Sequence, residues 1–466
     1  MYNFINKILA IALCLISLLF SINVRSVQAK PSAQRLKVSS NNRFLIKEDG
    51  SPFFYLGDTA WELFHRLSRE EADEYLQDRV AKGFTVIQAV ILAEFDGLRV
   101  PNHYGHLPLE NNDPAKPVEA YFRHVDYVVK KAEKFGLYVG MLPSWGDKWN
   151  KKWGVGPEIF TPANAEIFGE FLGRRYKDRP IIWILGGDRN PENDLHLSII
   201  RAMAKGLRKG DGGNHLMTYH PQGWSNSSTW FRKDDWLDFN MFQSGHNARD
   251  VANYKFTTAN YDLNPPKPTL DGEPRYEDHP IDWKPEKGWF DDFDVRQAAY
   301  WSLMAGACGH TYGNHNIWQM FEQGREAISS ARTPWKKALS HTGAIQMGYI
   351  ARLFQSRPFT KLVPDQKIII DDQGEAADHI RAARAEDGSF AFVYIPTGKM
   401  AAIEMKKIAG QKVQAYWYNP RNGKSTKIGI FPNSGIREFN PPTNGRGNDW
   451  VLVLDNAAGK FSLPGM

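Results

Sequence analysis

The chain has 466 residues, of which 42% are hydrophobic and 13% aromatic, so it is long enough to bury one large core and a smaller second one. Its 58 lysines and arginines against 52 aspartates and glutamates give a formal net charge of +6. Such a small charge, spread over a chain of this length, excludes the concentrated basic surface of a nucleic-acid-binding protein.

Residues 1–29 are predicted to be a secretory signal peptide. Lys7 precedes an apolar run over residues 8–20, and Val27-Gln-Ala29 provides a small-residue cleavage site. The run is shorter than the roughly 20 residues that a membrane span needs. We therefore expect cleavage after Ala29, a secreted or periplasmic bacterial protein, and no stable membrane span afterwards. The mature chain then keeps one cysteine, Cys308, which we expect to be a buried small hydrophobe without a disulfide partner.

From residue 43 onward, short apolar strands alternate with helical patterns. The segment 43–58 is predicted to form a hairpin through Asp49-Gly50, followed by a buried strand that ends at Asp58. Ser68-Arg-Glu-Glu71 has the pattern of a capping box at the start of a helix. Further strands are predicted at 85–92, 137–145, 181–185, 216–220, 237–243, 268–271 and 309–313, and further helices at 118–135, 162–176, 195–208, 295–307 and 334–354.

This alternation of strand and helix recurs about eight times over roughly 300 residues, which indicates a parallel sheet. The count favours a closed (β/α)8 TIM barrel over an open doubly wound sheet. No Gly-x-Gly-x-x-Gly or Walker-type loop follows the first strand, so the usual nucleotide sites are excluded and no cofactor is predicted.

The pattern changes at about residue 357 to short strands separated by Asp-Gly, Thr-Gly and Asn-Gly turns, which predicts an all-β sandwich. Its expected strands are 367–370, 379–385, 390–395, 413–418 and 450–454. The chain is thus divided into a signal peptide (1–29), a barrel domain (30–356) and a β-sandwich domain (357–466). No low-complexity linker separates the last two, so they are expected to pack directly on each other.

Two of the predicted barrel strands end in a single acid. Asp188 follows the run Ile181-Ile-Trp-Ile-Leu-Gly-Gly, and Glu273 follows Thr-Leu-Asp-Gly and precedes Pro274, which stops the strand. Strand ends converge on one face of a barrel, so acids from strands four and seven can approach within the roughly 5 Å of a retaining glycoside hydrolase. One acid would be the nucleophile and the other the general acid/base. The local alternatives are a turn cap for Asp188 and a structural arginine partner for Glu273.

Other polar and aromatic residues at the strand ends suit a sugar, because aromatic faces cover C–H surfaces while carboxylates, amides and imidazoles bind hydroxyls. We predict substrate contacts from Asp58, Trp61, Glu62, Gln88, Trp145, Arg189, His220, Gln243, His246, Tyr276, Tyr312 and Trp318. For Asp58 and Glu62, holding neighbouring loops is an equal alternative.

Other residues of the same regions carry weaker signals. The tryptophans of the expected loops, among them Trp153, Trp224 and Trp283, fit a sugar platform and core packing equally well. The His310/His315 spacing and the Glu277-Asp-His279 run lack a third ligand, so no metal site is predicted.

Several motifs together resemble the apiosidase-like glycoside hydrolases of bacterial pectin degraders. The motifs are Gly57-Asp-Thr-Ala-Trp61, Trp183-Ile-Leu-Gly-Gly-Asp188-Arg-Asn, Asp271-Gly-Glu273-Pro, Thr311-Tyr-Gly313, and, in the second domain, Tyr416-Trp-Tyr-Asn-Pro-Arg-Asn-Gly423 and Asp449-Trp-Val-Leu-Val-Leu-Asp455. The resemblance covers nearly the whole mature chain and implies Asp188 as acid/base, Glu273 as nucleophile and an apiose-bearing branched pectin, rhamnogalacturonan II, as substrate. The family's sandwich is sometimes labelled collagen-binding, and nothing in this sequence supports that property.

Two alternatives stay open from the residues alone. The same machinery serves arabinosides, galactosides and glucosides, since a barrel does not specify its sugar. A carbohydrate-binding protein without catalysis is the other alternative, although decay of an enzyme into a binder would have spared the aromatic residues and lost the acids, and both acids are present.

Overall fold

The computed structural model describes residues 34–370 and 372–466; the predicted signal peptide lies outside the described residues. A small antiparallel sheet of β1 (Leu36–Val38), β2 (Leu45–Lys47) and β3 (Pro52–Phe53) precedes the barrel. It contains the predicted hairpin through Asp49-Gly50.

Eight parallel strands of the described chain form a closed ring. They are β4 (Tyr55–Thr59), β5 (Val86–Leu92), β6 (Tyr138–Ser144), β7 (Ile181–Gly186), β8 (Met217–His220), β10 (Asn240–Gln243), β11 (Thr269–Asp271) and β12 (Gly309–Tyr312). Six of them pair in the order β12-β4-β5-β6-β7-β8, and β10 pairs with β11. Asp238 N donates to Met217 O at 2.9 Å and Cys308 N donates to Thr269 O at 2.9 Å, which joins these two sets at both ends. The predicted (β/α)8 barrel is confirmed.

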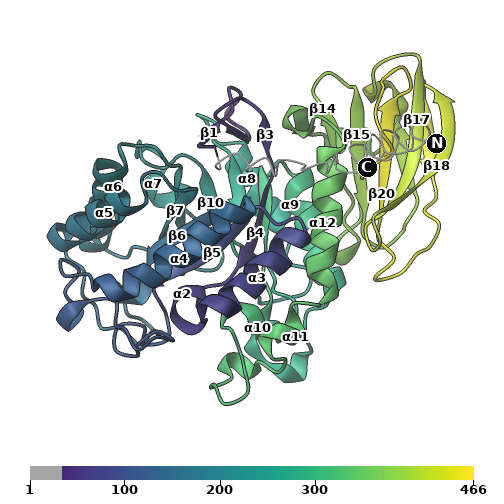
Figure 1. The fold of residues 1–466 in the computed structure, drawn as a ribbon. Helices are drawn as coiled ribbons and strands as arrows, with labels where there is room; N and C mark the ends of the chain where they lie inside the picture. Colours follow the sequence, from purple (N-terminus) through teal and green to yellow (C-terminus); the bar gives the residue numbers. More distant parts are fainter. Residues whose placement is uncertain (1–33, 371) are drawn as a thin grey trace, which may run out of the picture. The chain divides into compact units, whose positions relative to one another are not determined.

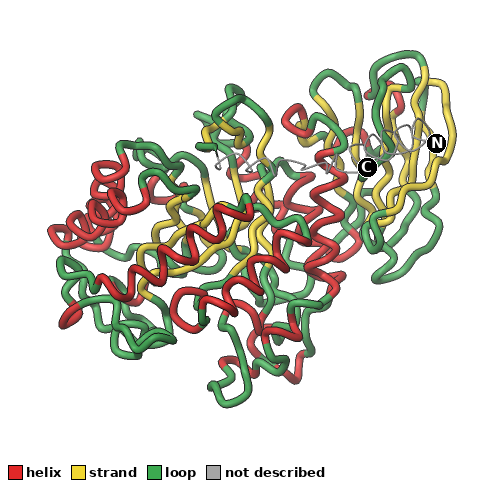
Figure 2. Tube along the Cα trace, viewed as in Figure 1, coloured by secondary structure: helices red, strands yellow, loops and turns green. Residues whose placement is uncertain are grey.

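Helices surround the barrel strands, as the red coils around the yellow strands show (Figure 2). The longer ones are α3 (Arg69–Ala81), α4 (Glu119–Phe135), α5 (Pro162–Tyr176), α6 (Asp194–Asp211), α8 (Asn253–Tyr261), α9 (Asp292–Met304) and α12 (Thr342–Gln355), and the short ones are α2 (Leu63–Arg66), α7 (Ser228–Phe231), α10 (His315–Trp318) and α11 (Trp335–Ala338). Ser68 and Glu71 form the predicted capping box of α3. The helix predicted over 334–354 is instead divided into α11 and α12.

The second domain is an antiparallel β-sandwich, as predicted. One sheet has the order β13 (Leu362–Pro364), β14 (Arg381–Ala385), β15 (Phe390–Ile395), β20 (Trp450–Asn456), β17 (Lys412–Asn419) and β18 (Lys424–Pro432). The other pairs β16 (Ala401–Glu404) with β19 (Ile436–Phe439). The strand predicted at 367–370 is wrong, because Asp365 Oδ1 accepts from Lys367 N and begins a short 3₁₀ turn.

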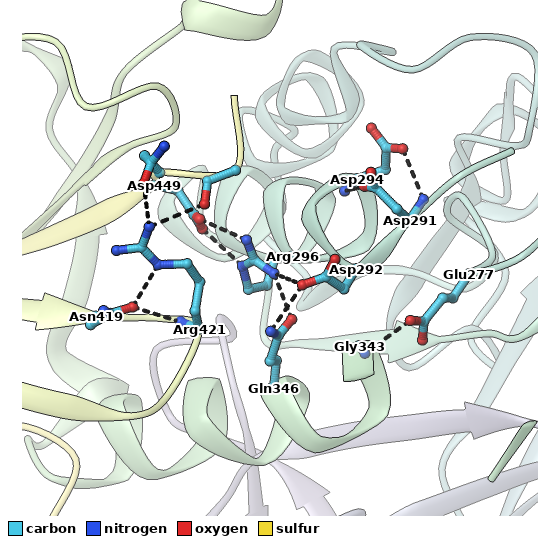
Figure 3. Close-up of polar contacts among 12 residues, drawn as sticks. Glu277, Asp291, Asp292, Asp294, Arg296, Gly343, Gln346, Asn419, Arg421 and Asp449 are labelled. Carbon is cyan, nitrogen blue, oxygen red and sulfur yellow. Dashed lines mark hydrogen bonds and ion pairs between the residues drawn. The ribbon is translucent and has the colours of Figure 1, made fainter. Parts of the chain in front are cut away.

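Helix α9 of the barrel contacts β14 and β15 of the sandwich, and these elements lie side by side in Figure 1. At this interface Arg296 of α9 makes two bonds to Asp449, from Nε to Oδ2 at 3.0 Å and from Nη2 to Oδ1 at 2.7 Å (Figure 3). Its Nη1 also donates to Asp292 and Gln346 at 2.6 Å. Both Arg296 and Asp449 are buried, so the pair has no competing water.

Apolar contacts continue the barrel core into the sandwich. The rings of Tyr300 and Tyr394 stack with centroids 4.6 Å apart, and Phe354 meets Phe392 edge-on at 5.4 Å. These four residues belong to one cluster of buried side chains that also contains barrel strands. Buried Cys308 belongs to it too, as the predicted small hydrophobe. The two domains therefore share a hydrophobic core.

Candidate active site

Asp188 stands at the end of a sharp turn after β7. Gly186, Gly187 and Asp188 all have left-handed backbones, with φ of 98°, 82° and 56°. A Cβ on Gly187 would lie 2.8 Å from Gly146 N, so only glycine fits there. A left-handed aspartate is strained, and such strain concentrates at functional sites because the surrounding structure must hold it in place.

Glu273 follows β11 and is held by two histidines. His246 Nε2 lies 3.0 Å from Oε1, and His220 Nε2 lies 3.1 Å from Oε2. The backbone N–H of Asp188 donates to His220 Nδ1 at 3.2 Å. Because Nδ1 accepts this bond, the proton of His220 is on Nε2 and faces Glu273. The imidazole of His220 thus connects the backbone of Asp188 to the carboxylate of Glu273.

The surroundings push the pKa values of the two acids apart. Burial, followed by the negative charge of Glu273, raises the pKa of Asp188 to about 7, against the opposing effect of Arg189. Burial alone would also raise the pKa of Glu273, but the hydrogen bonds and charges of His220 and His246 outweigh it and lower that pKa to about 2. At neutral pH Glu273 is ionised, while Asp188 has a substantial protonated fraction.

A cavity of about 510 Å³ opens over these two carboxyls. Its volume is in the range of pockets that hold small ligands. Among the described residues, six tryptophans line it: Trp61, Trp145, Trp153, Trp224, Trp283 and Trp318. Trp61 and Trp145 are buried, with ring centroids 5.3 Å apart, and Trp61 also meets His220 edge-on at 5.5 Å. The cavity thus has an aromatic lining beside two acids.

Half of the twelve predicted contact residues line the cavity, and two more contact the candidate acids. Trp61, Trp145, Gln243, His246, Tyr276 and Trp318 line the cavity. His220 lies behind its wall, between the two acids. Arg189 is fully buried; its Nη1 lies 3.2 Å from Asp188 Oδ2, and its guanidinium covers the ring of Trp153 at 4.0 Å. Arg189 therefore holds Asp188 rather than facing the cavity.

Four further predicted contacts do not line the cavity either, because their side chains bind other protein groups. Asp58 Oδ2 pairs with Arg79 Nε at 2.7 Å and accepts from Tyr75 Oη at 2.5 Å. Glu62 Oε2 pairs with His65 Nδ1 at 2.7 Å, so Asp58 and Glu62 follow the alternative in which they hold the structure.

Gln88 and Tyr312 are the other two. Gln88 lies inside the barrel, where Oε1 accepts from Tyr55 Oη at 3.1 Å and Nε2 donates to Gly272 O at 3.2 Å. Tyr312 Oη donates to Glu277 Oε2 at 2.5 Å. Their inward or lateral direction depends on strand register, which the sequence did not reveal.

The predicted set omitted several residues of the cavity wall: Glu94, Trp153, Gln222, Trp224, Asn247, His279 and Trp283. Trp153, Trp224 and Trp283 have 58%, 56% and 48% of their surface exposed, which excludes core packing and leaves their rings accessible to a ligand. Trp224 and Trp283 have φ of 64° and 56°, a costly conformation for a bulky residue. Asn247 Oδ1 accepts from Trp224 Nε1 at 2.8 Å and fixes that ring.

Within the described residues, no group of three or more histidines, cysteines, aspartates and glutamates is arranged to hold a metal ion. Two of the histidines of the weak metal signals have other partners. His279 Nδ1 lies 2.6 Å from Pro280 O, and His315 Nε2 lies 3.0 Å from Ser329 O.

Comparison with known families identifies the barrel. Residues 39–361 match the family described as "Apiosidase-like, catalytic domain". The chain belongs to the apiosidase-like family. Residues 363–455 of this apiosidase-like protein match a family described as "Putative collagen-binding domain of a collagenase". The suspected relationship is therefore confirmed for both domains.

Solved structures agree with this assignment. A protein titled "Glycoside hydrolase" is 36% identical, covers 92% of this chain and 98% of its own, and superposes with a TM-score of 0.85. A glycoside hydrolase family 5 protein from Bacteroides vulgatus is 34% identical over 93% of this chain and 95% of its own, with a TM-score of 0.86. The apiosidase-like protein is a glycoside hydrolase. No curated protein matches it in sequence. None of the helices in residues 34–370 and 372–466 has the length and apolar character to cross a membrane.

Proposed function

We propose that this protein is a secreted retaining glycoside hydrolase that cleaves apiosidic bonds in branched plant pectin, rhamnogalacturonan II. The observation that carries the mechanism is the pair of acids with oppositely shifted pKa values, one ionised and one able to be protonated at neutral pH. The sugar is inferred from membership of the apiosidase-like family. Secretion rests on the pattern of residues 1–29.

In the proposed reaction, a carboxylate oxygen of Glu273 attacks the anomeric carbon while Asp188 gives its proton to the departing glycosidic oxygen. His220 and His246 keep Glu273 ionised and oriented. Asp188, now deprotonated, removes a proton from water, and that water breaks the glycosyl–Glu273 ester with a second inversion. The anomeric configuration is retained overall.

The first experiment identifies the sugar. Aryl apiosides, arabinofuranosides, galactosides and glucosides are incubated with the mature protein, and release of the aryl alcohol is measured. Faster hydrolysis of the apioside supports the proposal, and faster hydrolysis of another sugar supports the alternative of a barrel glycosidase with different specificity. Absence of hydrolysis across the panel and on rhamnogalacturonan II would support a non-catalytic binder.

The second experiment assigns the two acids. Glu273→Gln removes the nucleophile, so activity should fall by several orders of magnitude on every substrate. Asp188→Ala should slow natural glycosides strongly, and azide should restore its turnover of an activated aryl glycoside and give a glycosyl azide of retained configuration. If azide instead restores the Glu273 variant with a product of retained configuration, Glu273 is the acid/base and Asp188 the nucleophile. An inverted product from the unmodified enzyme would exclude the retaining mechanism.

A further inference from the structure

A second cleft, of about 810 Å³, adjoins the catalytic cavity. Its walls come from α2, which follows β4, and from the segments that follow β5, β6 and β12. These four strands lie next to one another in the barrel, in the order β12-β4-β5-β6. The lining includes Arg66, Phe95, His103, Val155 and Arg325. Val155 is 41% exposed, and the cleft thus combines open apolar surface with hydrogen-bonding groups, as a saccharide requires.

The cleft and the cavity share three residues, Glu94, Trp153 and Ile328, and therefore meet along one edge. Trp153 has more than half of its surface exposed at this junction, and the guanidinium of Arg189 covers part of its ring. A ligand that extends from the two acids past the exposed ring of Trp153 would thus enter the second cleft.

The junction lies on the side of Asp188. Arg189, which covers Trp153, also binds Asp188 through Nη1. Glu94 is close enough to Asp188 for their charges to interact. The leaving group of a glycoside must lie next to the acid that protonates it. The direction from the nucleophile past the acid therefore points into the second cleft.

Glu94 is chemically distinct from the two catalytic candidates. Its carboxyl makes no hydrogen bond to another described residue, although it belongs to the walls of both spaces. Burial, followed by the negative charges of Asp188 and Glu62, raises the pKa of Glu94 well above its ordinary value. Its protonated form, which has an O–H to donate, is therefore favoured more than in an ordinary glutamate.

We propose that the second cleft binds the leaving-group side of the substrate, a chain of several sugars, and that the carboxyl of Glu94 forms a hydrogen bond with this chain at the junction. The inference rests on the proposed glycosidase function. It extends that function by predicting that the enzyme prefers a polysaccharide or oligosaccharide leaving group to a small one. The cleft would contribute binding that a para-nitrophenyl leaving group cannot use.

The first test fills the cleft. Val100 and Val155 are exposed on its walls, and Val100→Trp and Val155→Trp narrow it. We expect each to lower kcat/KM on rhamnogalacturonan II at least about tenfold more than on para-nitrophenyl apiofuranoside, a difference of roughly 1.4 kcal/mol. Ile167→Trp on α5, which is exposed outside both spaces, is the matched control and should change neither rate.

The second test concerns Glu94. Glu94→Ala should lower kcat/KM on rhamnogalacturonan II about tenfold or more, and Glu94→Gln, which keeps a donor, should restore most of it. Equal losses on polymer and aryl substrate, or polymer hydrolysis unchanged in both tryptophan variants, would overturn the inference. If the unmodified enzyme cleaves neither substrate, the proposed function itself fails. If it cleaves both, but each variant loses the same fraction of kcat/KM on polymer and on aryl substrate, only the inference about the second cleft fails.

Discussion

The alkaline limit of activity should depend on the leaving group. The active form needs Asp188 protonated and Glu273 ionised, with pKa values of about 7 and about 2. Above the pKa of Asp188 the acid is lost, and below that of Glu273 the nucleophile is lost. For a substrate with a poor leaving group, kcat/KM should therefore be level at acid pH and fall about tenfold per pH unit above neutrality.

A dinitrophenyl glycoside of the same sugar departs without a proton, so it separates this cause from general loss of structure. Two pH units above neutrality, the poor leaving group should have lost about a hundredfold in kcat/KM, while the dinitrophenyl glycoside should have lost little. Stopped-flow or steady-state release of the phenol at each pH gives both profiles. An equally steep alkaline fall for both substrates, or a persistent fall on the poor leaving group in Asp188→Asn, would refute the assignment of Asp188.

Three further outcomes are expected. Asp449→Ala leaves Arg296 buried without its main partner and should lower the free energy of unfolding in urea by about 3–5 kcal/mol, whereas Arg296→Met with Asp449→Leu should recover much of it; a loss below about 1 kcal/mol would contradict a tightly packed interface. Removal of residues 357–466 exposes Tyr300 and its neighbours and should give insoluble protein, so a soluble, active barrel would show that the shared core is dispensable. Activity should survive exhaustive treatment with EDTA; loss followed by recovery with Ca²⁺ or Zn²⁺ would show that the acids or histidines have been misinterpreted.

The sequence was most informative where the signal is local. Apolar runs of strand length, helix caps and glycine stops predicted the barrel, and the position of Asp188 and Glu273 directly after two such runs placed both on the correct face. The sandwich was harder, because β18 is largely exposed and has no regular alternation of buried and exposed residues. The alternation of apolar and polar residues that marks a half-buried strand was therefore absent from this segment.

The site residues that sequence reasoning misplaced depend on contacts between distant segments. Asp58 is an acid at a strand end just as Asp188 is, but Arg79 and Tyr75 of the following helix occupy it. Conversely, Trp224 reaches the cavity because a left-handed backbone turns it there, and tryptophan has no tendency to adopt that conformation. Which of two aspartates at strand ends faces the cavity therefore depends on how the distant segments pack.

The turn after β7 and the loop after β6 are joined by hydrogen bonds and close packing. Gly146 N donates to Gly187 O at 3.0 Å, Arg189 Nε donates to Asn150 O at 3.1 Å, and a Cβ on Gly146 would lie 2.3 Å from Arg189 Cγ. An insertion or deletion within residues 146–150, the segment that leads to Trp153, is thus expected to move Asp188. Homologues and laboratory variants that acquire new leaving groups should consequently do so by exchanging the side chain at position 153, while insertions accumulate in loops that have no such connection to the acid.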